Sequence, residues 1–263
     1  VRPELSPDTD MVTGYEEATA LDELSRAVEG SITCPRAGPD LLTGLSALAL
    51  GLACMGGAQA APDVSLEVTH KSSVLGADGI QRSTVFTERV IRQGDTVWIE
   101  RVMPAGAHQE DEHAKAKVGA AKDHKHADLS AATRWIQRLP DGKLKFRLVA
   151  MHDQVVVDIA PAEYATVGFD GAWLAAYHLI DPAVLKTLKP GETTPQGQWF
   201  ENTKGRNAVR VLWDAKREMP LQVLSQGANG NRTTTVKVLN TAIKNPWDVT
   251  KKFAQKDYSD FLD

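Results

Sequence analysis

Residues 206–239 read RNAVRVLWDAKREMPLQVLSQGANGNRTTTVKVL, and this stretch decides the fold class. Apolar and polar side chains alternate from 208 to 213, which places Val209, Val211 and Trp213 on one face. A period of two residues is typical of a β-strand, because successive strand side chains point to opposite faces. The segment therefore predicts a strand with one face directed into a core.

The rest of this stretch predicts two more strands. After the bend DAKREMP at 214–220, the alternation resumes at 221–224. Residues 227–231, GANGN, tolerate positive φ, so the chain can reverse there. Residues 233–239 are rich in β-branched side chains, which favour strands. Together these segments predict an antiparallel meander with one buried face.

The same alternation recurs upstream, between Gly- and Pro-containing turns. It predicts strands at residues 64–69, 83–92, 96–103, 133–139, 144–150 and 154–159. A helical spacing at 170–179 predicts a short helix that carries Trp173 and Tyr177 on one side. The tail, residues 246–263, predicts a short amphipathic helix. Its expected docking residues are Trp247, Phe253, Tyr258, Phe261 and Leu262. The fold class predicted is mainly β, with an α+β mixture of elements.

Composition and charge are those of an ordinary soluble globular protein. Of 263 residues, 42% are hydrophobic and 24% are charged. Residues 1–60 hold 3 of the 30 basic and 9 of the 34 acidic residues, which leaves 27 and 25 in the remainder. The remainder carries no basic stripe interleaved with aromatic residues, so we expect no nucleic-acid partner.

Residues 41–60, LLTGLSALALGLACMGGAQA, resemble a secretory signal peptide. An apolar centre is followed by small residues and by Ala58-Gln59-Ala60, an Ala-x-Ala cleavage site. The apolar run is too short to span a bilayer comfortably. We therefore expect export to the periplasm, no transmembrane segment in the mature form, and a peripheral contact with the membrane as an open alternative. A buried helix of a cytoplasmic protein is the other interpretation of 41–60. Residues 1–40 are expected to be an upstream extension, either disordered or a product of a start codon placed too far upstream.

Both cysteines, Cys34 and Cys54, precede the predicted cut. The mature chain would then contain no disulfide, no thiolate nucleophile and no cysteine metal ligand. Lipidation of Cys54 is a rival interpretation. Gly51 stands three residues before it, where a lipoprotein signal normally has Leu or a similar residue.

Two runs of sequence carry a resemblance to a known family. These are MHDQVVVDIAPAEYATVGFDG at 151–171, and LWDAKREMPLQVLSQ followed after a turn by NRTTTVKVL, at 212–239. Their order after a leader resembles the superfamily of periplasmic proteins similar to the lipoprotein carrier LolA and the receptor LolB. The resemblance covers residues 64–240. It implies a strongly curved antiparallel sheet, an incomplete barrel closed by a few short helices, around an apolar cavity. It implies a β domain at 61–245 that carries an apolar ligand or a lipoprotein.

A histidine-rich insertion interrupts this domain at residues 105–130. Four of the seven histidines of the chain fall within it, namely His108, His113, His124 and His126, with several carboxylates among them. Imidazoles with carboxylates suit Zn²⁺ or Cu²⁺, so these four are the candidate metal ligands. A solvated loop that binds nothing specific is the alternative. His70 and His152 are expected at strand ends on the surface, and His178 is expected to be a partly buried structural residue.

Two functional hypotheses follow, and neither is enzymatic. We found no Gly-x-Ser-x-Gly, His-Glu-x-x-His or Gly-Lys-Ser/Thr motif, and no cofactor is required. The first hypothesis is a non-catalytic periplasmic protein whose hydrophobic groove binds a lipid, a lipoprotein or another apolar partner. The candidate groove residues are Trp98, Trp135, Phe146, Trp173, Trp199 and Trp213. The alternative is a metal-handling or envelope regulatory accessory protein that uses the loop at 108–126.

Export with cleavage predicts that the mature protein begins at Ala61, directly after the Ala-x-Ala site. Expression in a Gram-negative host, followed by Edman or mass-spectrometric analysis of the N-terminus, checks this. A protein that still begins at Val1 would refute cleavage.

Overall fold

The computed structural model describes residues 61–103, 129, 131–203 and 207–261. Within these ranges, twelve strands form a single sheet in the order β12-β6-β5-β4-β3-β2-β1-β11-β10-β9-β8-β7. The strands are β1 Val64–Leu75, β2 Gln81–Gln93, β3 Thr96–Val102, β4 Thr133–Arg138, β5 Leu144–Ala150, β6 Val155–Ile159, β7 Lys189–Thr194, β8 Gly197–Asn202, β9 Ala208–Asp214, β10 Met219–Gly227, β11 Gly230–Val238 and β12 Ala254–Asp257. The helices are short: η2 Pro161–Glu163, η3 Ala165–Val167, α3 Trp173–His178, η4 Pro182–Thr187, η5 Pro246–Lys252 and η6 Tyr258–Phe261.

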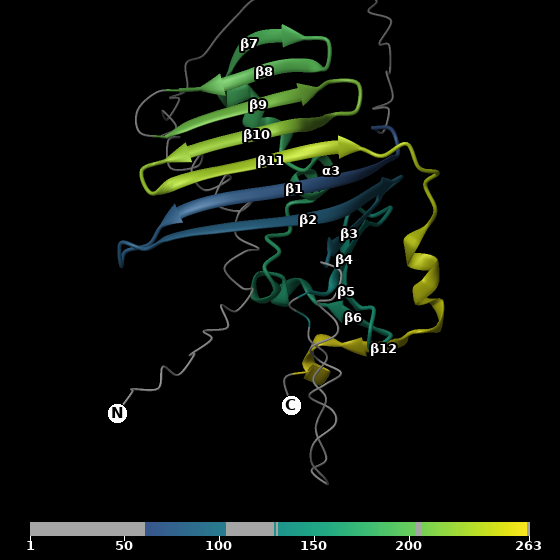
Figure 1. Cartoon of the computed structure of the whole chain (residues 1–263). Coiled ribbons are helices and arrows are strands. Elements are labelled where there is room, and N and C mark those ends of the chain that lie inside the picture. The colour runs from purple at the N-terminus through teal and green to yellow at the C-terminus, as the bar shows by residue number, and fades with distance from the viewer. Residues whose placement is uncertain (1–60, 104–128, 130, 204–206, 262–263) are drawn as a thin grey trace, which may run out of the picture.

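The predicted fold class is confirmed. The protein is mainly β with a few short helices, and the sheet is curved but not closed into a barrel, since β7 and β12 are separate edges. Figure 1 shows β7–β11, β1 and β2 side by side, while β3–β6 swing round behind them. One detail of the prediction was wrong. The sheet is not wholly antiparallel, because β12 pairs parallel with β6.

The meander at 206–239 forms as predicted, as β9, β10 and β11. Its second turn brings Gly230 against the backbone of β1, where a side-chain β-carbon would collide with the carbonyl oxygen of Ser73. Glycine is therefore required for β11 to lie beside β1. The tail differs from the prediction, because 246–261 holds β12 between two 3₁₀ turns instead of one amphipathic helix.

Strand alternation divides the sheet into two faces. We call the face that carries Leu66 and Val68 the inner face, and the opposite one the outer face. The chain leaves the sheet at β6, near one edge, and re-enters it at β7, which is the other edge. Residues 160–188, which we call the inner crossover, must therefore span the whole inner face (Figure 1).

The inner crossover packs on the sheet in chain order. Tyr164 and Phe169 join a cluster on β4–β6, Tyr177 and Leu179 join one on β1–β3, and Val184 joins one on β9 and β10. A second connection, residues 239–253, is the outer crossover and leads from β11 to β12. It covers part of the outer face by packing Ile243, Trp247 and Phe253 onto a cluster that includes Trp98.

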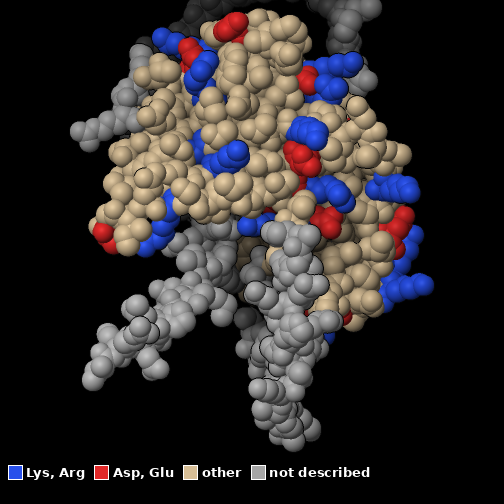
Figure 2. Space-filling view, in the orientation of Figure 1, with Lys and Arg blue, Asp and Glu red and all other residues tan. Residues whose placement is uncertain are grey.

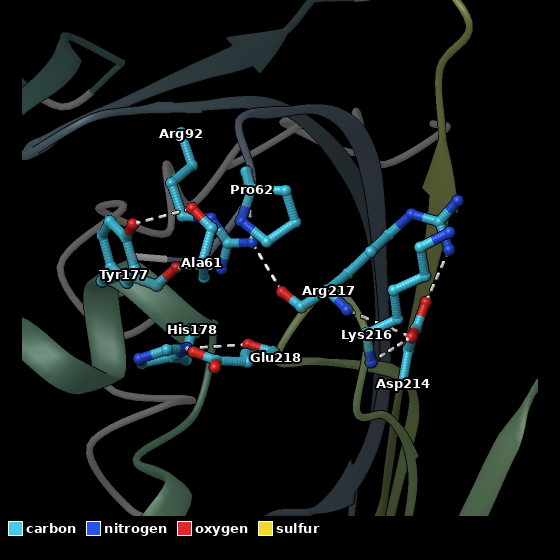
Figure 3. Close-up of polar contacts among 9 residues, drawn as sticks. All are labelled: Ala61, Pro62, Arg92, Tyr177, His178, Asp214, Lys216, Arg217 and Glu218. Atoms are coloured by element: carbon cyan, nitrogen blue, oxygen red, sulfur yellow. Dashed lines mark hydrogen bonds and ion pairs between the residues drawn. The ribbon is translucent and has the colours of Figure 1, made fainter. Parts of the chain in front are cut away.

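One buried arginine, Arg92 of β2, joins three separate parts of the chain (Figure 3). Its guanidinium donates to the carbonyl oxygens of Tyr177 at 3.1 Å, Pro62 at 3.1 Å and Arg217 at 2.6 Å. These oxygens belong to the inner crossover, to the entry into β1 and to the β9–β10 turn. Burial lowers the pKa of Arg92, and nearby carboxylates such as Glu218 oppose that shift.

The same junction holds two non-glycine residues at positive φ. Leu179, which ends α3, has a φ of 66°, and Glu218, in the β9–β10 turn, has a φ of 51°. Such conformations are costly and persist where surrounding contacts hold them. His178 Nδ1 donates to the carbonyl oxygen of Glu218 at 2.7 Å, which ties the two turns together (Figure 3). His178 is thus a buried structural residue, as predicted, and burial lowers the pKa of its imidazole.

Replacing Arg92 by Leu leaves three carbonyl oxygens without their donor. Each buried unsatisfied group costs about 1–3 kcal/mol, so we expect the free energy of unfolding to fall by about 3 kcal/mol or more. Urea denaturation measures the change. Arg89→Leu, at an exposed position of the same strand, is the matched control. An equal decrease in the free energy of unfolding in the two variants would contradict the role assigned to Arg92.

Candidate functional site

The inner face carries apolar side chains from β6 across to β9. Three clusters cover it, and all three include residues of the inner crossover. Their strand members include Leu66, Val68, Val90, Val97 and Ile99 in the first, Ile136, Phe146, Leu148, Val157 and Ile159 in the second, and Val211, Trp213 and Val223 in the third. The three clusters form an apolar layer beneath a cover that has little regular structure.

The apolar surface ends abruptly on three neighbouring strands. Leu66, Val90 and Ile99 lie opposite one another in one row of β1, β2 and β3. In the next row Glu88 and Arg101 lie side by side, and in the row after that His70 lies opposite Phe86. We call His70, Phe86, Glu88, Arg101 and Arg134 the inner-face polar cluster.

Glu88 is the centre of this cluster. Its carboxylate accepts hydrogen bonds from Arg134 Nη2 at 2.6 Å and from His70 Nε2 at 3.2 Å, and its side chain is only 12% exposed. Burial raises the pKa of Glu88, but the charge of Arg134, the hydrogen bond from His70 and the charge of Arg101 outweigh it and hold that pKa at about 2. Glu88 is therefore ionised at neutral pH and is too weak a base for proton transfer there.

His70 and Arg101 are held by the ring of Phe86. The imidazole of His70 stacks on Phe86 with centroids 4.6 Å apart, and its Nδ1 lies 3.2 Å from Thr234 Oγ1. The guanidinium carbon of Arg101 lies 3.9 Å from the centroid of Phe86. Stacking on an aromatic face fixes the plane of a guanidinium. These contacts fix the orientation of the charged groups of Glu88, Arg101 and Arg134 relative to one another.

The sequence alone did not single out this cluster. His70 was expected at a strand end on the surface, and that was wrong. It lies in the middle of β1, and its side chain is 13% exposed. The alternation that puts Val64, Leu66 and Val68 on one face also puts residue 70 there. The burial of His70 on the inner face could therefore have been predicted from the period of two. His152 does lie in an exposed turn.

The six predicted groove residues do not share one face. Phe146 and Trp213 lie in the inner-face clusters, and Trp173 of α3 packs between the first and second of these. Trp98 and Trp135 belong to the outer-face cluster under the outer crossover. There Trp135 stacks on Trp247, with the ring centroids 6.3 Å apart. Trp199 is also on the outer face, where the guanidinium carbon of Arg210 lies 4.6 Å from the centroid of its ring. The structure therefore brings only Phe146, Trp173 and Trp213 to the inner face.

The charges of the outer face occur largely in pairs. In Figure 2, which views this face, the charged side chains are scattered among uncharged ones. Glu67 pairs with Lys237 at 3.6 Å, and Glu201 pairs with Arg210 at 3.0 Å.

The candidate metal ligands His108, His113, His124 and His126 lie outside the described residues, so Zn²⁺ or Cu²⁺ binding there stays a prediction. The leader at 41–60 and the extension at 1–40 also lie outside them. Within the described ranges, three or more His, Cys, Asp or Glu side chains do not converge on a common point. None of the helices in those ranges is long and apolar enough to cross a bilayer.

No protein-family profile matches the sequence, and no curated protein matches it. Solved structures do match. A putative outer membrane lipoprotein-sorting protein domain from Vibrio parahaemolyticus is 9% identical, with 72% of this chain and 92% of that chain covered and a TM-score of 0.33. A LolA superfamily protein from Nitrosomonas europaea is also 9% identical, with 73% and 91% covered and a TM-score of 0.30.

A structure of PNGF-II is 11% identical, with 76% of this chain covered and a TM-score of 0.32. The chain spans about a third of the length of PNGF-II, 32%. Likenesses at these TM-scores and identities say nothing about a ligand or a reaction.

Because the folded pKa of Glu88 lies below its ordinary value of 4.5, its ion pairs stabilise the protein above about pH 4.5. That stability is lost as the pH falls toward 2. Glu88→Gln should lower the free energy of unfolding by on the order of 3 kcal/mol at pH 6, with the difference from the parent vanishing near pH 2. Urea denaturation at a series of pH values measures this.

Asp78→Asn is the control, since the hydrogen bond from Arg82 also lowers the pKa of Asp78 to about 2, but at a fully exposed site. It should change the unfolding free energy much less. A Glu88→Gln effect that does not vary with pH would contradict the ion-pair account.

Proposed function

We propose that this chain is an exported, non-catalytic periplasmic protein that binds a lipid, a lipoprotein or another apolar partner on the inner face of its sheet. The observation that carries the proposal is the apolar layer that runs from β6 to β9, covered mainly by the inner crossover. Export is supported by the leader at 41–60.

The cover of the inner face is suited to opening. The inner crossover contains one six-residue α-helix and short 3₁₀ turns. It meets the sheet mainly through side chains such as Phe169, Trp173 and Leu179, and through a few hydrogen bonds near Arg92. Segments held by side-chain packing open at lower free energy than strands within a sheet ladder. An apolar ligand can therefore replace crossover side chains on the same surface.

Trp173 is the side chain to test. It packs against the first and second apolar clusters, whereas its neighbour Leu174 is 45% exposed. Trp173→Ser should strengthen binding of the uncharged probe N-phenyl-1-naphthylamine about tenfold, since the probe no longer has to displace a large apolar side chain whose burial contributes about 1.5–3 kcal/mol. Leu174→Ser should leave the affinity unchanged. Fluorescence titration measures both, with far-ultraviolet circular dichroism to confirm folding.

Native mass spectrometry of the protein purified from the periplasm of a Gram-negative host provides the direct test. We expect a lipid adduct that organic solvent extracts. A bare chain that also fails to bind the probe would refute the proposal. A bound transition metal that is lost on deleting residues 107–129 would favour the metal-handling alternative instead.

A further inference from the structure

His178, the last residue of α3, is a buried imidazole that joins the inner crossover to the β9–β10 turn (Figure 3). Its Nδ1 lies 2.7 Å from the carbonyl oxygen of Glu218 and donates its proton to it. A neutral imidazole makes this contact with its single proton. The other ring nitrogen, Nε2, has no hydrogen-bond acceptor among the described residues, so a second proton would gain no partner there.

This hydrogen bond also connects two residues whose backbones are strained. Leu179 directly follows His178 and has a φ of 66°, and Glu218 has a φ of 51°. Side chains other than glycine rarely adopt such conformations, which persist only where the surrounding contacts hold them. Both residues can relax once the bond between the two turns is lost, so strain favours the separation of the turns.

A positive charge on His178 is unfavourable while the turns are in contact. Burial lowers the pKa of the imidazole, and the charge of Arg92 on β2 lowers it further. The carbonyl of Glu218, its carboxylate at 3.9 Å from Nδ1, and Asp181 oppose this shift without cancelling it. Tyr177, whose ring centroid lies 4.9 Å from that of His178, stays neutral because burial raises the pKa of its hydroxyl.

Acid therefore favours separation of the two turns. When His178 leaves the turn and meets water, its pKa returns toward 6.5, so the separated form binds more protons than the closed form. The stability of the closed form is complete above pH 6.5 and falls as the pH drops from 6.5 toward the lowered pKa. At pH 5.5 an exposed imidazole is about ten times more often charged than neutral, which raises the opening constant about tenfold.

The segment that His178 attaches covers one end of the apolar layer. Residues 178–188 continue through η4, and Ile180, Val184 and Leu188 pack on β9 and β10 in the third cluster. The hydrogen bond from Arg92 to the carbonyl oxygen of Tyr177 lies just before this segment and does not involve His178. Loss of the His178 contact thus frees residues 178–188 while the chain before them stays attached.

We propose that protonation of His178 releases residues 178–188 from the β9–β10 turn, so that acid uncovers the part of the inner face formed by β9 and β10. The release itself does not depend on the proposed function. Its consequence, easier access of an apolar ligand to the inner face, rests on that function.

Hydrogen exchange of the full chain at pH 7.5 and pH 5.5, followed by mass spectrometry and corrected for the intrinsic effect of pH on amide exchange, tests the release. We expect the protection of amides in residues 179–188 to fall about tenfold at pH 5.5, while that of β1 and β11 stays unchanged. His178→Asn keeps a donor near the position of Nδ1 but takes up no proton, so its protection should not vary with pH. His152→Asn, in an exposed turn, is the matched control and should respond as the parent does.

Equal protection of residues 179–188 at the two pH values in the parent would overturn the proposal. A fall of the same size in His178→Asn would overturn it as well, since another group would then be responsible. The parent alone decides the matter if the variant does not fold. A nuclear magnetic resonance titration that gives His178 a pKa of 6.5 or higher would contradict the release, because the closed form would then bind protons as readily as the open one.

The uncharged probe N-phenyl-1-naphthylamine separates this inference from the proposed function. We expect the parent to bind it several-fold more tightly at pH 5.5 than at pH 7.5, and His178→Asn to bind it equally at both. Acid-induced loss of protection without probe binding at either pH would support the release and overturn the proposed function. Probe binding that is the same at both pH values, despite that loss of protection, would overturn the link between release and ligand access.

Discussion

The inner crossover is a geometric necessity on which the rest of the structure depends. Because β6 and β7 lie at opposite ends of the sheet, residues 160–188 must traverse one whole face. They carry their aromatic and aliphatic side chains to three clusters in turn, and so they complete a core that the sheet cannot close by itself. A sheet that stays open needs such a cover, since its apolar face would otherwise meet water.

Arg92 attaches the inner crossover to the sheet and to two other segments by hydrogen bonds. A charged side chain in the core is costly to desolvate, and here the charge is used to hold three carbonyl oxygens from distant segments. The turns at Leu179 and Glu218, both at positive φ, meet at the same place. Hydrogen bonds at this junction hold one part of the crossover. The rest is held mainly by side-chain packing, with a hydrogen bond from Tyr164 Oη to the carbonyl oxygen of Leu144 at 3.0 Å. Under the proposed function, that difference suits a segment that stays attached while a ligand replaces part of it on the sheet.

Much of the fold was predictable, and most of the candidate site was not. Alternation predicted the strands at 144–150 and at 208–213 well, because a strand with one buried face has an apolar residue at every second position. It predicted no strand at β7, where Pro190 and Gly191 interrupt the pattern of a strand. Proline is tolerated in an edge strand, and β7 has a neighbour on one side only. The six aromatic residues were found as candidates, but their distribution between two faces depends on the strand order.

The sequence by itself determined the β class, the hairpin at 227–231 and which residues of one strand share a face, because these follow from local dihedral preferences and a period of two. Only the tertiary structure decided that His70, Glu88 and Arg134 meet, that Arg92 joins three distant carbonyl groups, and that the crossovers cover opposite faces. The physical reason is that the alternation of a strand says which side is buried and nothing about which strand lies beside it. Strand order is set by long-range pairing across the whole chain, and the inner-face polar cluster exists only once β1, β2, β3 and β4 have paired.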